Sequence, residues 1–299
     1  MLAITTPTGN IGSRVAENLL KTDEPLILLA RTPEKLPEDF RKKAVIKQGS
    51  TDDAEFMKAA TVGARALFLC VPPVFQAKIL RETIFNFVRA AVSAIEENKI
   101  ETVVFVSSGG KGVKNAGSIS ILHEAEKMLG ETKANVAFLR AGFFMENFLN
   151  FLPTILQAGK VFAPASGELV LPMVAAKDIA AIAAELLKKG DWRGEKIVPI
   201  HGAADLSLNE AMKILGAGIG KELEFVTVPE FLFEQGLLKI GASPDVVHET
   251  LNLYRAFAEG SIYENEPRTA ESTTTTTLDE WTRESFAPAF KTQLLSQNE

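Results

Sequence analysis

The first half of the chain alternates short apolar runs with longer segments in which apolar residues recur at helical spacing. The apolar runs predict strands at Leu2 to Thr5, Leu26 to Ala30, Ala44 to Gln48, Ala66 to Val71, Thr102 to Ser107 and Val136 to Leu139. The segments between them predict helices near Ile11 to Lys21, Ala54 to Ala60, Phe75 to Asn98 and Ile119 to Gly130. Strands that alternate with helices are typical of βαβ units on a parallel sheet.

The strict alternation ends near residue 150, and mixed elements follow. The pattern predicts helices near Phe148 to Ala158 and Lys177 to Lys189, a turn-rich stretch at Ala163 to Leu171, and strands near Lys196 to Ile200 and Glu222 to Val228. Ser207, followed three residues later by Glu210, has the spacing of a capping box and marks the start of another helix. The threonine run from Thr273 to Thr277 is interpreted as a loop or an extended connector. We therefore expect a second, smaller lobe.

Composition and charge narrow the classes of partner. The chain has 299 residues and a net charge of −6, so no strong positive field favours nucleic acid. Cys70 is the one cysteine, which excludes an intramolecular disulfide framework and a cysteine-based metal site. No apolar run approaches about 18 residues, and the first residues lead straight into a glycine loop, so we expect a cytoplasmic protein without a membrane span or metal.

A glycine loop between the first predicted strand and the first predicted helix carries the candidate chemistry. Backbone N–H groups at a helix start attract an anion, and glycine lets backbone and phosphate approach closely. Gly9 and Gly12 fill two of the usual glycine positions, whereas Thr6 stands in the first. The loop predicts a pyrophosphate site formed by Thr6, Thr8, Gly9, Asn10, Ile11 and Gly12. The alternative is a plain strand-to-helix turn.

Arg31 ends the second predicted strand, near where NAD-dependent domains place an acidic residue on the ribose hydroxyls. An arginine there pairs instead with a 2′-phosphate, and Lys35 adds charge nearby. The pattern therefore favours NADP(H) as the cofactor. The alternative is an ordinary surface arginine.

These residues and several later motifs resemble the NmrA-like branch of the atypical short-chain dehydrogenase/reductase family. The motifs that carry the resemblance are Thr8 to Gly12, Arg31, Cys70 to Pro73, Ser107 with Ser108, Leu139 to Asn147, Pro172 to Val174 with Asp178 to Ala180, and Phe225 to Pro229. The resemblance implies an α/β fold: a Rossmann-type doubly wound parallel sheet over residues 1–150 with a return segment at about 172–200. It also implies a smaller C-terminal α+β substrate lobe over most of residues 151–299, closing a substrate cleft.

The resemblance also implies cofactor contacts beyond the loop. Cys70, Val71 and Pro72 would pass near the adenosine and nicotinamide halves of NADP(H), and Ser107 would lie close to the same cofactor. For a substrate wall it implies an aromatic set, namely Phe143, Phe144, Met145, Asn147, Phe148 and Tyr254. The alternative for this set is plain hydrophobic core.

The Tyr-x-x-x-Lys pair of typical short-chain dehydrogenases is absent, because neither Tyr254 nor Tyr263 is followed by lysine four residues later. His123 occupies a place where some quinone and dye reductases of the family have a histidine, so it is the first candidate for the proton donor. Ser107 or Ser108 would form a hydrogen bond with the substrate. Lys111, between glycines, is the second candidate. The alternatives are a structural histidine, with the neighbouring Glu126 orienting Arg140, and a solvated loop lysine.

Three functions remain open from the sequence. The first is an NADP(H)-dependent reductase of a small hydrophobic substrate such as an imine, iminium, enal or quinone, in secondary metabolism. The second is an NADP-sensing regulatory protein without turnover, and the third is a biosynthetic enzyme that retains NADP and catalyses a non-redox cyclisation or isomerisation. We expect a monomer or homodimer with a small-molecule substrate as its partner.

Overall fold

The structure is a computed structural model that describes residues 1–110, 112–259, 262–263 and 266–296. It contains two compact units. The first comprises residues 1–108, 118–140 and 179–198, and the second comprises residues 109–117, 141–178 and 199–299. After Arg140 the chain thus leaves the first unit, and it returns to this unit at Ile179. The predicted division instead kept residues 1–150 in the first domain, with a return segment at about 172–200.

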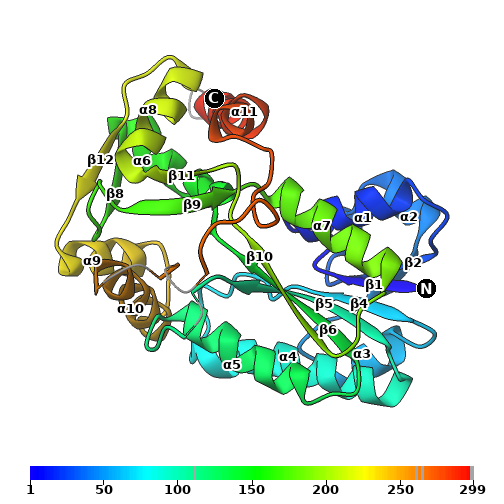
Figure 1. Cartoon of the computed structure of the whole chain (residues 1–299). Helices are drawn as coiled ribbons and strands as arrows, with labels where there is room; N and C mark the ends of the chain where they lie inside the picture. The colour runs from blue at the N-terminus through cyan, green and yellow to red at the C-terminus, as the bar shows by residue number, and fades with distance from the viewer. Residues whose placement is uncertain (111, 260–261, 264–265, 297–299) are drawn as a thin grey trace. The chain divides into compact units, whose positions relative to one another are not determined.

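The central sheet of the first unit has the strand order β10-β6-β5-β4-β1-β2-β3 (Figure 1). These strands are β1 (Leu2–Thr5), β2 (Leu26–Ala30), β3 (Val45–Gln48), β4 (Ala66–Leu69), β5 (Thr102–Ser108), β6 (Asn135–Ala141) and β10 (Glu195–Ile200). The pairs of β1 with β2, β1 with β4, β2 with β3 and β4 with β5 are parallel. The chain therefore winds outward from β1 in both directions, which confirms the predicted doubly wound α/β fold.

Helices cover both faces of this sheet (Figure 1). One face carries α3 (Ala54–Ala60), α4 (Leu80–Asn98) and α5 (Ser118–Gly130); the other carries α1 (Gly12–Leu20), α2 (Glu38–Lys43) and α7 (Ala176–Lys189). Every residue of β1, β2 and β4 is buried as a result.

The helix α4 begins later than its apolar pattern predicts. It was expected from Phe75 and begins at Leu80, because the Ala77 N–H bonds to the Val74 carbonyl in a turn and Ile79 is extended at φ −135° and ψ 110°. Phe75 and Ile79 are about half exposed, so they belong to a connecting segment outside the core.

The second unit has two small sheets, with orders β11-β9-β7 and β12-β8. The strands are β7 (Phe143–Phe144), β8 (Lys160–Ala163), β9 (Val170–Val174), β11 (Ala204–Ser207) and β12 (Glu224–Thr227). The helices are η2 (Met145–Phe151), α6 (Leu152–Ala158), α8 (Leu208–Ile219), α9 (Glu230–Lys239), α10 (Pro244–Glu259), α11 (Leu278–Trp281), the π-helical turn η3 (Thr282–Phe286) and α12 (Ala287–Ser296).

Two local structures predicted in this unit, a helix start and a turn-rich stretch, had different outcomes. The capping box that starts α8 is confirmed: the Ser207 hydroxyl accepts from the Glu210 N–H, and the Glu210 carboxylate accepts from the Ser207 N–H. The predicted turn-rich stretch extends too far toward the C-terminus, to Leu171, because β9 begins at Val170 and continues through Pro172. Among the described residues, no helix has both the length and the apolarity to cross a bilayer.

Candidate functional site

The loop between β1 and α1 turns tightly because of two unusual positions. Thr6 has a left-handed backbone, with φ 50°, and its carbonyl accepts the Gly9 N–H at 2.9 Å. A Cβ atom added to Gly12 would lie 2.3 Å from the Thr6 carbonyl oxygen and 2.8 Å from that of Thr5. Gly12 is therefore required for the helix to begin this close to the strand, and Thr6 adopts the conformation that glycine takes at lower cost.

The start of α1 presents backbone donors that the protein leaves free. The N–H groups of Asn10, Ile11 and Gly12 have no acceptor within the described part of the chain, whereas the Ser13 N–H bonds to the Gly9 carbonyl. The Arg14 guanidinium donates to the Asn10 carbonyl oxygen at 2.7 Å, which brings a positive charge to this loop. Free donors, a helix dipole and a nearby cation suit the pyrophosphate of a dinucleotide. Sequence reasoning identified the loop but not Arg14.

Arg31 and Lys35 follow the C-terminal end of β2, the strand that pairs with β1. Arg31 follows β2 directly, Lys35 ends the short helix η1 (Pro33–Lys35), and both side chains are exposed. Neither forms an ion pair among the residues that the structure describes. Since β1 and β2 pair in parallel, Arg31 stands at the same edge of the sheet as the glycine loop. An uncompensated guanidinium at this place fits a 2′-phosphate.

The C-terminal end of β4 is hydrogen-bonded to the side chain of Thr5 in β1. The Thr5 hydroxyl donates to the Phe68 carbonyl and accepts the Cys70 N–H, each at 3.0 Å. Burial raises the pKa of the Cys70 thiol to about 11, so it stays protonated at neutral pH. Val71 and Pro72 follow half-buried at this edge. The structure thus brings the predicted cofactor segments of β1, β2 and β4 to one edge.

A buried carboxylate organises the end of β5. The Ser107 hydroxyl donates to Glu126 Oε1 at 2.6 Å, and Arg140 donates to the same carboxylate through Nε at 3.0 Å and Nη2 at 2.6 Å. The Glu126–Arg140 pair matches the alternative interpretation of this region. Since the Ser107 proton is committed to Glu126, the Ser107 hydroxyl can only accept a further hydrogen bond.

His123 lies beside the last residue of β5. Its Nε2 atom is 2.8 Å from the Ser108 carbonyl oxygen, which can only accept, so Nε2 carries a proton. The lone pair of the neutral ring is therefore on Nδ1, and a proton can leave Nδ1 only from the doubly protonated ring. The structure brings His123 and Ser108 together, but their catalytic roles stay predictions. Lys111 lies outside the described residues.

The predicted substrate wall belongs to the second unit. Met145 and Phe148 are 1% exposed and fill its hydrophobic core, so any contact with substrate rests on the other members of the set. Phe143, Phe144 and Asn147 are half-buried, and the Phe143 ring centre is 5.4 Å from that of Phe148. Tyr254 is also half-buried, with its ring centre 5.1 Å from that of Phe233 on α9, and burial raises its pKa to about 12.

Two acidic residues of the resemblance motifs have structural partners that the sequence did not reveal. The buried Glu146 carboxylate accepts from the Trp281 indole N–H at 3.0 Å and from the Ala176 N–H. Asp178 accepts from the Thr276 hydroxyl at 2.6 Å and from its N–H, so the threonine run is held by a buried contact rather than by solvent alone. No cluster of three or more metal-ligating side chains occurs in the described ranges.

Comparisons with known proteins extend over almost the whole chain. A model of the NmrA-like family matches residues 1–282. NAD(P)H azoreductase from Xenophilus azovorans is 26% identical over 261 residues, which cover 86% of this chain and 87% of that protein. Quinone oxidoreductase 2 from Escherichia coli strain K12 is 26% identical over 254 residues, with 84% and 85% covered. A crystal structure of the NADPH-dependent quinone oxidoreductase of Escherichia coli complexed with NADPH aligns with a TM-score of 0.78 at 23% identity, over 96% of this chain and 100% of that one.

Proposed function

Because the chain belongs to the NmrA-like family, we propose that it is an NAD(P)H-dependent reductase of small molecules, with NADP(H) as the preferred cofactor. The relatives named as an azoreductase and a quinone oxidoreductase support reductase chemistry in general. The finer substrate class, a small hydrophobic imine, iminium, enal or quinone, is our own inference. In such an enzyme the bound dinucleotide supplies a hydride, and the protein supplies binding, orientation and protons.

The observation that carries this proposal is the cradle at the start of α1. Its free N–H groups and the close approach at Gly12 leave room for a diphosphate against the backbone. Arg31, exposed and without an ion pair among the described residues, is the group that would distinguish NADP(H) from NAD(H).

The end of β5 suits an acceptor that needs little acid. Ser107 can accept a hydrogen bond, and His123 can release a proton from Nδ1 only when its ring is doubly protonated. A ketone needs a strong proton donor as hydride arrives, whereas a quinone, an iminium or an enal accepts hydride with less assistance. The missing Tyr-x-x-x-Lys pair therefore favours these acceptors.

The test combines turnover with cofactor binding. NADPH absorbance is followed with a panel of quinones, imines and enals, and NADP⁺ and NAD⁺ are titrated by calorimetry. We expect NADPH consumption with at least one acceptor. Bound NADPH that no acceptor consumes would support the regulatory alternative, and product formed without loss of NADPH would support the non-redox alternative; either outcome contradicts the proposal.

Cofactor choice is tested at one side chain. The substitution Arg31→Ala removes a charge-assisted contact of roughly 1.5–3 kcal/mol, so NADP⁺ affinity should fall about 10- to 100-fold while NAD⁺ affinity stays within about twofold. Arg41→Ala, at an exposed arginine of α2, is the matched control and should change neither affinity. Equal losses for both dinucleotides with Arg31→Ala would remove the assignment.

A further inference from the structure

The helix α9 of the second unit carries apolar side chains on both of its faces. On the inner face, the Phe233 ring centre lies 5.1 Å from that of Tyr254 on α10. Three other large apolar side chains of the helix are exposed to solvent, namely Phe231 at 57%, Leu232 at 46% and Leu238 at 42%. Large apolar side chains that gather on one exposed face are typical of an interaction surface.

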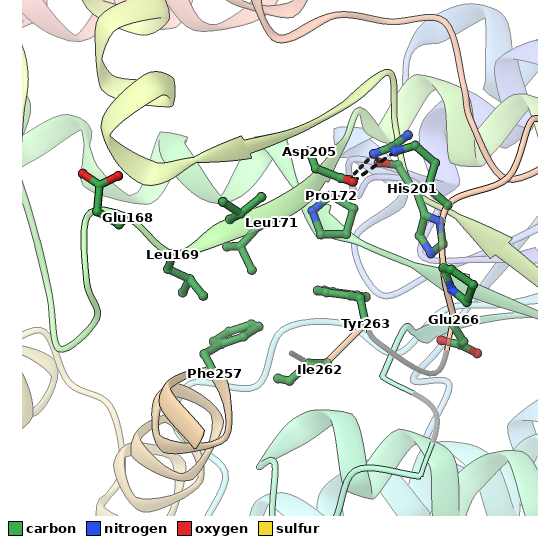
Figure 2. Close-up of a pocket in the computed structure, with 13 residues that line it drawn as sticks. Glu168, Leu169, Leu171, Pro172, His201, Asp205, Phe257, Ile262, Tyr263 and Glu266 are labelled. Carbon is green, nitrogen blue, oxygen red and sulfur yellow. Dashed lines mark hydrogen bonds and ion pairs between the residues drawn. The ribbon is translucent and has the colours of Figure 1, made fainter. Parts of the chain in front are cut away.

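The pocket of the second unit does not account for this exposed face. α9 and α10 lie side by side (Figure 1). The pocket has a volume of about 490 Å³, and Figure 2 shows Phe257 of α10 pointing into it, beside Ile262 and Tyr263. Among the described residues that line it, α10 supplies Phe257 and α9 supplies none. The outer face of α9 is therefore separate from this pocket.

The exposed face of α9 has a symmetric sequence about Gln235. At about 100° per residue, positions three and four residues away on either side lie on the same face of a helix. Leu232 and Leu238 are three residues from Gln235, and Phe231 and Lys239 are four residues from it. A second α9 that lies antiparallel across a twofold axis at Gln235 therefore presents the same positions in reverse order.

This antiparallel arrangement pairs side chains that attract each other. It places Leu232 against the partner's Leu238, so that two exposed apolar side chains cover one another at each end. It also places Phe231 against the partner's Lys239, and an ammonium group is attracted to the face of an aromatic ring. Because the axis is twofold, each of these contacts occurs twice.

The remaining charges of α9 do not oppose the pairing. Glu234 lies opposite the partner's Gly236, and Glu230 lies opposite the partner's Ile240 while it forms an ion pair with Arg255 of its own chain. A Cβ atom added to Gly236 would meet no side chain and no backbone of another segment within 4 Å. The helix is therefore uncovered beside the axis, where two backbones can approach closely.

The size of the apolar patch indicates a weak dimer. Together with Ile240, which directly follows the helix and is 72% exposed, the three exposed side chains offer roughly 400 Å² of apolar surface. The largest apolar patches on soluble monomers measure roughly 300–600 Å² and are often functional. A stable dimer buries about 800 Å² on each partner, so contacts through α9 alone favour reversible association.

We propose that α9 is a self-association surface, through which two copies of this chain form a reversible, twofold-symmetric dimer with Gln235 at the axis. The occupant is a second copy because the exposed residues of α9 are matched, position by position, by the same helix running in the opposite direction. The inference goes beyond the proposed function and does not depend on it, since it involves no residue of the proposed nucleotide-binding edge.

Sedimentation equilibrium of the full chain tests the association. Between about 5 and 500 µM protein, the wild type should show a reversible equilibrium of monomer and dimer. Leu238→Asp places a carboxylate against the partner's Leu232 and should weaken the dimer at least tenfold. Leu295→Asp, at an exposed leucine of α12 in the same unit, is the matched control and should not weaken it. A wild type that stays monomeric, or equal losses in the two variants, would overturn the proposal.

A charge exchange tests the register. Phe231→Lys places a lysine opposite the partner's Lys239 and should weaken the dimer at least tenfold. Adding Lys239→Glu turns this repulsion into an ion pair and should restore the wild-type affinity to within about threefold. Lys213→Glu, at an exposed lysine of α8, makes the same change in net charge and should restore nothing. Equal recovery with both lysine substitutions, or recovery with neither, would contradict the register.

Cross-linking at the axis does not depend on weakening the dimer. Helices in contact pack about 8–10 Å apart, which brings two residues at the axis within reach of a disulfide. Mild oxidation of Gln235→Cys should link two chains, whereas Val62→Cys, at an exposed position of the first unit, should not. Equal linkage in both variants would overturn the proposal. A monomeric wild type that binds phosphatidylcholine vesicles, with binding lost in Phe231→Lys, would assign this face to a lipid surface and overturn it as well.

Discussion

The substitution Glu126→Gln should destabilise the protein more than an ordinary surface change. It removes the carboxylate that Arg140 and Ser107 share, and the Arg140 and Glu126 side chains are only 13% and 7% exposed. Removing one partner of a buried ion pair typically costs about 3–5 kcal/mol, and here the Arg140 guanidinium and the Ser107 hydroxyl both lose the carboxylate that accepts their hydrogen bonds. Since Arg140 retains slight exposure, we expect a loss near the lower end of that range, about 3 kcal/mol in the free energy of unfolding.

The same helix provides a matched control two residues away. Glu124 forms an ion pair with Arg81, and these side chains are 41% and 42% exposed. Exposed pairs contribute roughly 0.2–1 kcal/mol, so Glu124→Gln should cost about 1 kcal/mol at most. The two variants make the same chemical change on α5, and burial is the main difference between them.

Urea unfolding followed by circular dichroism measures both losses, and hydrogen exchange of peptides from α5 and β6 locates them. The double variant Glu126→Gln with Arg140→Gln should lose less than the sum of the two single variants, because the two side chains contact each other directly. The reasoning is refuted if Glu126→Gln costs no more than Glu124→Gln, or if the two single losses at Glu126 and Arg140 simply add.

Three further changes test the proposed nucleotide-binding edge of the sheet. Gly12→Ala should reduce the NADP⁺ affinity measured by titration at least tenfold, because its Cβ atom would lie 2.3 Å from the Thr6 carbonyl oxygen and displace the loop. An affinity equal to that of the wild type would contradict the proposed pyrophosphate site at the start of α1. Iodoacetamide alkylation of Cys70 should be slow at pH 8 and accelerate toward pH 11, because a pKa of about 11 leaves a thiolate fraction of about 0.1% at pH 8. Fast labelling at pH 8 would contradict the raised pKa of this thiol. His123→Gln can still donate to the Ser108 carbonyl but cannot release a proton to the acceptor, so the turnover number should fall roughly 100-fold or more, and an unchanged turnover number would exclude His123 as the donor.

Local patterns were sufficient to predict the sheet and to identify the loop that we propose as the cofactor site. The bounds of β1 and β2 were predicted to the residue, because fully buried parallel strands appear as continuous apolar runs. The loop at Gly9 and Gly12 was identified since its signal is contiguous in sequence and lies between a strand and a helix. These features depend on neighbours within a few residues, which a single sequence displays directly.

Features that depend on distant partners were missed. Nothing near Thr276 indicates that its hydroxyl bonds to Asp178, and nothing near Glu146 indicates Trp281, because each pair joins segments about a hundred residues or more apart. The pocket around Tyr263 was missed for the same reason, since its walls come from β9, α10 and the chain that follows α10. Periodicity describes which face of an element is apolar, but not which other element covers it.

The left-handed backbone at Thr6 bears on how such loops are recognised across sequences. A pattern search that demands three glycines would discard this chain at its sixth residue. The peptide geometry that the first glycine normally supplies is nonetheless present there, carried by a threonine. This loop is therefore better described by the dihedral angle required at each position than by the residue type found there. Asparagine and glycine at position 6 should preserve the free energy of unfolding far better than valine or isoleucine, as urea unfolding would measure.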